Sequence, residues 1–199
     1  MLTVGLTGGI ASGKSIVARL LQERGCAIIE ADLLAHEYLK LENPVSQEVI
    51  REFGAGILDA GGKIDRAKLG EIVFDSAGKI ARLNAIIHPR VLNEIARRLQ
   101  ELKRIGKTDI AVVVAALHIE AGYYKTFDRL AVAWCRPEQQ FERLISRGFT
   151  PEQAQRRIAS QMPMEEKRKL ADDQIDCSGT LEETSRQVDE ILARWKQIA

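Results

Sequence analysis

Two short apolar stretches flank a helical pattern in the first 30 residues. Residues 2–7 are mostly apolar, residues 8–15 are rich in Gly and Ser, and apolar positions then recur at helical spacing up to Gly25. Residues 26–29 form a second apolar stretch. A strand, a helix of about ten residues and a second strand make a β-α-β unit, which predicts a parallel sheet with a right-handed crossover. The pattern therefore indicates the α/β fold class.

The pattern changes twice along the rest of the chain. Residues 31–104 are mainly helical, with breaks expected at Asn43-Pro44, Gly54, Gly61-Gly62 and His88-Pro89. Residues 109–117 then form a continuous apolar run, typical of a strand buried on both faces, and we expect this run to be the central strand. Residues 130–134 and 174–176 predict two further strands.

Two helix starts are marked by a Thr with Gln or Glu three residues later, at Thr150 and Thr180. The helix after Thr180 has one apolar face, made of Leu181, Val188, Ile191, Leu192 and Trp195. Residues 136–169 are basic, with eight Lys or Arg against five Asp or Glu, and contain two predicted helices hinged at Gly148. These helices resemble a lid, and we name residues 137–171 the lid segment.

Composition limits the classes of function. The chain has 199 residues, 45% of them hydrophobic, and a formal net charge of +1, which excludes a disordered protein and a general nucleic-acid binder. No apolar run approaches the roughly 20 residues of a membrane-spanning helix, and the N-terminus lacks a secretory signal pattern. Three widely spaced cysteines favour a reducing compartment. We therefore expect a cytoplasmic protein without nucleic-acid or membrane partners; a monomer and a homo-oligomer both stay open.

Residues 8–15 are Gly-Gly-Ile-Ala-Ser-Gly-Lys-Ser, which fits the P-loop pattern between a strand and a helix. Glycines let main-chain N–H groups turn around an anion, and the helix start directs its positive end to the same place. Lys14 is expected to contact the β- and γ-phosphates of ATP, and the Ser15 hydroxyl to bind Mg²⁺. A Gly-rich turn with an exposed Lys is the alternative. We expect the nucleotide to contact Gly9, Ala11, Ser12, Gly13, Lys14, Ser15 and Ile16.

Two other classes of nucleotide-binding protein are excluded. A dinucleotide-binding fold needs glycines at spacings of two and three, which residues 5–13 do not supply. A switch GTPase needs a guanine-reading Asn-Lys-x-Asp, which the sequence lacks. The P-loop therefore favours a protein that uses ATP.

Asp32 follows the second predicted strand, and ligands of open parallel sheets bind at the carboxyl ends of the strands. Its carboxylate is therefore placed to take the proton of an acceptor hydroxyl during phosphoryl transfer. The alternative for Asp32 is a helix cap, and Glu30 is the competing carboxylate.

Three further positions have both a functional and a structural interpretation. Arg143 and Arg147 share one face of a lid helix, so their guanidinium groups could reach the transferring phosphate. A solvated helical face is the alternative for both. His88, which precedes Pro89, is either a turn residue or a contact of the acceptor substrate.

The ordered set of motifs along nearly the whole chain resembles the dephospho-CoA kinase family. The P-loop alone is shared by many families, whereas the ordered set is much more specific. The set comprises residues 5–10 with 12–15, 31–36, Phe53-Gly54, 64–66, Leu69, Val73-Phe74, Leu83-Asn84, His88-Pro89, 157–161 and Ala171-Asp172.

The resemblance implies a single domain of residues 1–199: a P-loop kinase core of parallel strands and flanking helices (about 1–31, 105–136 and 172–199), a helical CoA-binding part (about 32–104) and a helical lid (about 137–171). It implies transfer of the ATP γ-phosphoryl group to the ribose 3′-hydroxyl of dephospho-CoA, the last step of coenzyme A synthesis, with Mg²⁺. Asp32 would be the catalytic base. Lys14 and Arg143 would also act in catalysis, Arg147 on the nucleotide, and His88 and Gln161 on the substrate.

The sequence departs from the family pattern at several positions. Ala11 stands at a usual Gly, Ile16 at a usual Thr, Glu30 at a usual Asp, and Cys177 at a usual Asn near the expected adenine pocket. Residues 116–120 lack the usual Pro and include His118. Two alternatives stay open: a P-loop kinase for another nucleoside, nucleotide or small hydroxyl acceptor, and a non-catalytic ATP-binding regulatory protein.

Overall fold

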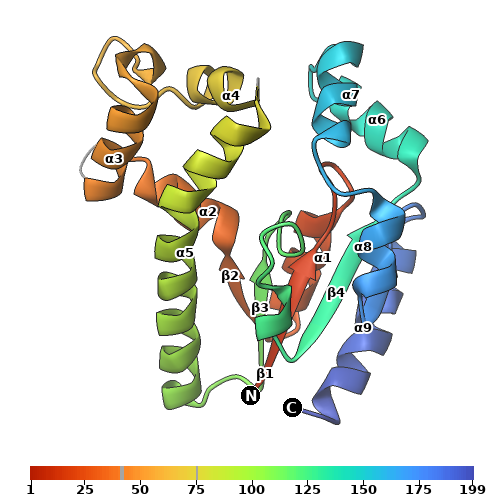
Figure 1. Cartoon of the computed structure of the whole chain (residues 1–199). Coiled ribbons are helices and arrows are strands. Elements are labelled where there is room, and N and C mark those ends of the chain that lie inside the picture. Colours follow the sequence, from red (N-terminus) through yellow and green to blue (C-terminus); the bar gives the residue numbers. More distant parts are fainter. Residues whose placement is uncertain (41–42, 75) are drawn as a thin grey trace. The chain divides into compact units, whose positions relative to one another are not determined.

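A computed structural model describes residues 1–40, 43–74 and 76–199 of the protein (Figure 1). The chain divides into two compact units: a sheet unit of Met1–Glu30 and Leu99–Ala199, and a helical unit of Ala31–Arg98. No helix within the described ranges is long and apolar enough to cross a membrane. The expected lid segment belongs to the sheet unit.

The described part of the sheet unit contains a five-stranded sheet, and all neighbouring strands in it are parallel. The strands are β1 (Leu2–Thr7), β2 (Ala27–Glu30), β3 (Ile110–Val114), β4 (Arg129–Trp134) and β5 (Asp173–Asp176), in the order β2-β3-β1-β4-β5. The expectation that residues 109–117 are the central strand is wrong, because β1 occupies that place. Both strands are interior and both are almost wholly buried, so an apolar run marks an interior strand without giving its order.

Helices α1 (Lys14–Glu23) and α9 (Leu181–Lys196) share one apolar core with the sheet. The expected apolar face of α9 is confirmed except at Leu181, which is exposed, and Trp195 is fully buried. The lid segment contains α6 (Pro137–Ser146), α7 (Pro151–Ala159) and α8 (Met164–Leu170). Both predicted capping boxes are present, at Thr150 before α7 and Thr180 before α9.

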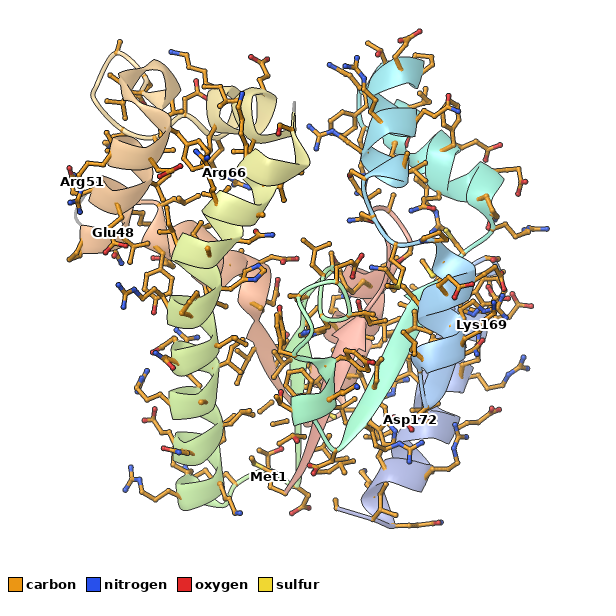
Figure 2. All side chains as sticks on the ribbon, in the orientation of Figure 1. Met1, Glu48, Arg51, Arg66, Lys169 and Asp172 are labelled. Atoms are coloured by element: carbon orange, nitrogen blue, oxygen red, sulfur yellow. The ribbon has the colours of Figure 1, made fainter. Side chains whose placement is uncertain are left out.

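The helical unit contains α2 (Ala31–Tyr38), α3 (Pro44–Phe53), α4 (Arg66–Phe74) and the first part of α5 (Ala77–Ile105). Figure 2 labels Glu48 and Arg51 on α3 and Arg66 at the start of α4. The expected break at His88-Pro89 is wrong, because α5 continues through it. Proline removes one helical N–H, but apolar positions four residues apart on both sides of it, Ile87, Val91 and Ile95, stay buried.

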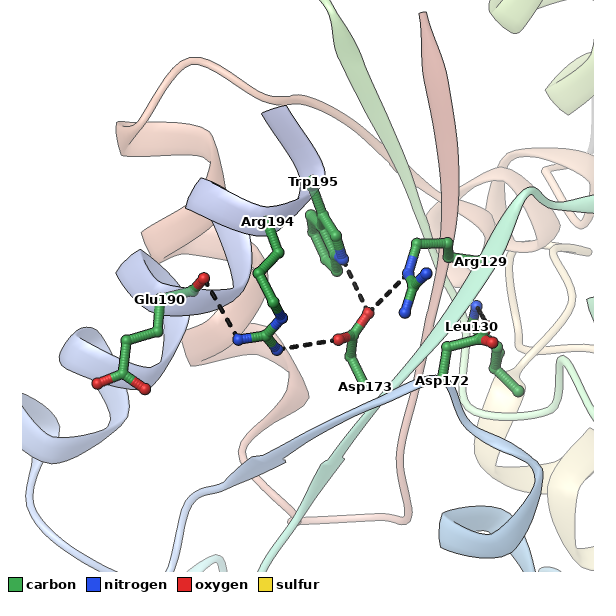
Figure 3. A network of polar contacts seen from close by, with 7 residues as sticks. All are labelled: Arg129, Leu130, Asp172, Asp173, Glu190, Arg194 and Trp195. Atoms are coloured by element: carbon green, nitrogen blue, oxygen red, sulfur yellow. Dashed lines mark hydrogen bonds and ion pairs between the residues drawn. The ribbon is translucent and has the colours of Figure 1, made fainter. Parts of the chain in front are cut away.

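The buried carboxylate of Asp173, at the amino end of β5, accepts hydrogen bonds from residues of α9 (Figure 3). Asp173 Oδ2 accepts hydrogen bonds from Trp195 Nε1 at 2.8 Å and Arg129 Nε at 2.9 Å, and Oδ1 accepts one from Arg194 Nη2 at 3.1 Å. The neighbouring Asp172 accepts a hydrogen bond from Leu130 N at 2.8 Å. This network lies at the amino ends of β4 and β5, whereas the P-loop follows the carboxyl end of β1.

Candidate phosphate-binding site

The P-loop lies between β1 and α1, as the sequence predicts. Strand β1 ends at Thr7, and α1 begins at Lys14. The first helical hydrogen bonds run from Ile16 N and Val17 N to Gly13 O, at 2.9 and 3.2 Å. The main-chain N–H groups of Lys14 and Ser15 therefore precede the helical ladder and lie at the positive end of the helix dipole, where an anion is stabilised.

The shape of the loop depends on two residues with positive φ. Gly13 has a φ of 104°, and a Cβ added there would lie 2.6 Å from the Cβ of Cys177. Ala11 has a φ of 59°, the left-handed conformation that is costly for a residue with a Cβ. Its carbonyl accepts a hydrogen bond from Arg143 Nη1 at 3.2 Å. The family's usual Gly at this position is thus explained by the backbone, and this chain keeps the conformation with Ala.

Ser12 supplies direct support for an anion in the loop. The residue is 1% exposed, and its Oγ has no hydrogen-bond partner among the described residues. A buried hydroxyl without a partner is unfavourable, and a phosphate oxygen would supply one. The half-buried Lys14 and the exposed Ser15 follow directly in the chain. Ser12, Lys14 and Ser15 are therefore suited to bind a triphosphate, with the Ser15 hydroxyl as a ligand of Mg²⁺.

Two glutamines of the lid segment hold the main chain of Ile10. Gln140 Nε2 donates to Ile10 O at 2.6 Å, and Gln161 Oε1 accepts from Ile10 N at 2.8 Å. Gly9 makes room for them, since a Cβ there would lie 2.7 Å from Gln140 Nε2. Gln161 is expected near the substrate from the family resemblance, whereas no sequence motif marks Gln140. An apolar cluster adds to this contact: Ile10, Ala11, Phe141, Leu144, Phe149, Ala154 and Ile158.

The two lid arginines differ in their surroundings. Arg143 is half-buried, and its guanidinium donates to Ala11 O and, at 2.7 Å, to Cys177 O. Arg147 is exposed at the end of α6. In this structure Arg143 therefore braces the P-loop main chain, and contact of either guanidinium with the transferring phosphate stays a prediction.

Cys177, at the family's usual Asn, packs against the P-loop as a neutral group. Burial, together with a smaller effect of the nearby Cys135, raises the pKa of its thiol to about 12. A thiol with so high a pKa stays protonated near neutral pH, so it does not repel a bound phosphate. Because Cys177 Sγ would lie 2.7 Å from a Cβ at Gly13, this side chain also limits the room behind the loop.

The helical unit contains the other predicted site residues. Asp32 is exposed in the first turn of α2, one residue past its start. Its charge acts on His36, whose Nε2 lies 2.6 Å from Arg66 Nη2. His88 lies within α5 rather than in a turn, and burial lowers its pKa. From the sequence, His36 and Arg66 stand out only as members of the motifs that resemble the family.

Comparisons with known proteins show the family of the chain. A family model described as dephospho-CoA kinase matches residues 2–183. The dephospho-CoA kinase of Carboxydothermus hydrogenoformans is 48% identical over 97% of this chain and 94% of its own length. A crystal structure from Thermus thermophilus superposes with a TM-score of 0.82 at 29% identity and 97% coverage of both chains. Dephospho-CoA kinase from Campylobacter jejuni gives a TM-score of 0.69 at 27% identity, covering 96% of this chain and 95% of its own.

Proposed function

Because the chain belongs to the dephospho-CoA kinase family, we propose that it transfers the γ-phosphoryl group of ATP to the ribose 3′-hydroxyl of dephospho-CoA. The products are coenzyme A and ADP. The observation that carries the proposal is the P-loop with the buried Ser12 hydroxyl, which has no partner among the described residues and comes two residues before a helix start suited to phosphate. Dephospho-CoA is assigned as the acceptor because the chain belongs to this family.

Binding of the nucleotide is assigned to the sheet unit. Lys14 contacts the β- and γ-phosphates, and the main-chain N–H groups of the P-loop surround them. Ser15 Oγ is the protein ligand of Mg²⁺, which prefers one or two protein oxygens together with phosphate oxygens. The metal neutralises charge on the phosphates when bound. Arg147 is assigned to the nucleotide, and Arg143 to the phosphate and the P-loop main chain.

Proton removal from the acceptor is assigned to Asp32. Its carboxylate is exposed, and α2 follows β2 without an intervening loop, which places Asp32 two residues past a strand's carboxyl end. A base within hydrogen-bond reach of the hydroxyl takes its proton as the phosphoryl group transfers, which contributes about 10²–10⁴ in rate. His88 and Gln161 are assigned to contacts with dephospho-CoA.

Acceptor profiling with the purified protein tests the activity. ADP formation is followed by a coupled assay with ATP, Mg²⁺ and either dephospho-CoA, a nucleoside, a nucleotide or a small alcohol. We expect turnover that depends on dephospho-CoA. Turnover with another acceptor in its place would make the chain a P-loop kinase of different specificity, and ATP binding without turnover on any acceptor would make it a non-catalytic protein.

Asp32→Asn tests the catalytic base, because the amide keeps the size of the side chain but cannot take a proton. We expect kcat to fall by about 10²–10⁴-fold while ATP binding stays normal. Glu37→Gln is the matched control, since it removes an exposed carboxylate from the same helix. Near-normal kcat in Asp32→Asn would move the role of base to another group.

A further inference from the structure

Lys167 of α8 is a buried charge that the proposed chemistry does not use. Its side chain is 0% exposed, and its Nζ lies 2.8 Å from Glu120 Oε1 and 2.7 Å from Ala116 O. Burial of an ammonium is unfavourable even when it is paired. Burial lowers the pKa of Lys167 most, and the positive charge of Lys14 lowers it further, against the influence of Glu120. The two lysines are thus close enough to interact.

The position of Lys167 is directly behind the phosphate cradle. Ala116 lies two residues past the end of β3, and its carbonyl also accepts a hydrogen bond from Thr7 Oγ1 at 3.2 Å. Thr7 is the last residue of β1 before the P-loop. The ammonium of Lys167 therefore lies at the carboxyl ends of two neighbouring strands, where the loop that holds phosphate begins.

The partner of Lys167 connects it to the P-loop by a second route. Glu120 Oε1 accepts a hydrogen bond from Met162 N at 3.0 Å. The adjacent Gln161 accepts from Ile10 N at 2.8 Å. A continuous series of polar contacts thus runs from Lys167 through Glu120 and the chain at Gln161-Met162 to the main chain of Ile10.

We propose that Lys167 is a positioning residue for the phosphates of ATP. Its ion pair with Glu120 fixes Gln161-Met162 and thereby holds the P-loop at Ile10, and its buried charge adds to that of Lys14. Two ammonium groups and one carboxylate leave a local positive charge, and a bound polyphosphate offsets the repulsion between the lysines. The inference rests on the proposed ATP binding and deepens it.

Lys167→Met tests this role, because Met keeps a long side chain and removes the charge. Calorimetry with ATP, ADP and adenosine requires no acceptor substrate. We expect about tenfold weaker binding of ATP and ADP, which corresponds to about 1.4 kcal/mol, and unchanged binding of adenosine. A role confined to folding would weaken all three ligands alike or none. Lys169→Met is the matched control, since Lys169 is on the same helix, pairs with Glu166 and is 68% exposed.

A second pair of variants tests the route through Glu120. Gln161→Ala removes the acceptor of Ile10 N, and we expect it to weaken ATP binding by about three- to tenfold, a range typical of one hydrogen bond. If both residues act through the same contacts, combining Gln161→Ala with Lys167→Met should cost less than the product of the two single effects. Glu120→Gln replaces Lys167→Met in this comparison if the latter fails to fold.

Three results would overturn the proposal: full ATP affinity in Lys167→Met, equal loss of ATP and adenosine affinity, or strictly multiplicative effects in the double variant. Failure of the proposed function is distinguishable from these results. If dephospho-CoA is not phosphorylated but ATP binds, the acceptor assignment is wrong, and the comparison of ATP with adenosine in Lys167→Met still decides the role of Lys167.

Discussion

The sheet unit contains two buried charges, one at the amino end of β5 and one at the carboxyl ends of β1 and β3, and their surroundings differ. Asp173, at the amino end of β5, receives three hydrogen bonds, from Trp195, Arg129 and Arg194. Lys167, near the carboxyl end of β3, contacts one carboxylate and one carbonyl and experiences the like charge of Lys14. Asp173 is thus paired with two positively charged arginines, whereas Lys167 has the positive charge of Lys14 nearby as well as its partner Glu120.

The pKa shifts express the same difference. Burial raises the pKa of Asp173, but the hydrogen bonds from Trp195, Arg129 and Arg194 together lower it below its usual value. The ionised form of Asp173 is therefore favoured in the folded protein. Burial lowers the pKa of Lys167 most, and Lys14 lowers it further against the influence of Glu120, so its charged form is less favoured than in water. We therefore expect the charge of Asp173 to stabilise the fold, and the charges of Lys14 and Lys167 to serve phosphate binding.

The largest effect is expected from Lys14→Met at the carboxyl end. Loss of a positive charge from the phosphate site should lower kcat/KM for ATP by about 10²–10³-fold, or about 2.7–4 kcal/mol. The melting temperature should change little, because Lys14 is only half-buried. Steady-state kinetics and thermal unfolding measure the two quantities. Arg19→Gln on the exposed side of the same helix is the control; a comparable kinetic loss there would show that any charge on α1 matters.

Asp173→Leu should have the reverse profile at the amino end. It leaves Trp195 Nε1 buried without its acceptor, which costs about 1–3 kcal/mol in the free energy of unfolding. Urea unfolding measures this loss. The KM for ATP, measured well below the melting temperature, should stay unchanged, because the hydrogen-bond partners of Asp173 are on β4 and α9 and not in the P-loop. A changed KM would contradict the division between the two ends.

Local patterns were enough to predict much of the fold and the phosphate cradle. The P-loop is a contiguous motif, so its position between β1 and α1 follows from eight residues and their flanks. Capping boxes at Thr150 and Thr180 are likewise local, and both are present. Strand order is not local, which is why an apolar run could not show that β1 is central.

The two buried charges could not be predicted for the same reason. Lys167 lies among Glu165, Glu166, Arg168 and Lys169, a run that has the composition of a solvated helical face. Its burial depends on a carboxylate 47 residues earlier in the chain. Asp173 likewise finds its donors 44 and 22 residues away. Gln161, which accepts the hydrogen bond from Ile10 N, is also distant, at 151 residues along the chain.

Acid should reveal the contribution of Asp173 without any change at the phosphate site. The folded pKa of Asp173 is lowered from its usual 3.8, so its stabilising effect is fully present above the unfolded pKa and is lost as the pH falls through the folded pKa. The difference in unfolding free energy between the wild type and Asp173→Asn should therefore be constant from about pH 5 to 7 and shrink below about pH 4. Urea unfolding from pH 2 to 7 measures it. A difference that stays constant to pH 2 would show that the charge of Asp173 is not what stabilises the fold.

The smallest effect should come from the outer partner of the same network. Arg194 is 58% exposed, so solvent screens its ion pair with Asp173, and Arg194→Gln should cost about 0.2–1 kcal/mol in unfolding free energy. Trp195 Nε1 and the less exposed Arg129 would still donate hydrogen bonds to the carboxylate of Asp173. If Arg194→Gln instead destabilised the protein as much as Asp173→Leu, the exposed arginine would be the principal counter-ion. The low pKa of Asp173 would then depend on charge near the surface and would rise in high salt, which titration of the wild type in 1 M NaCl would detect.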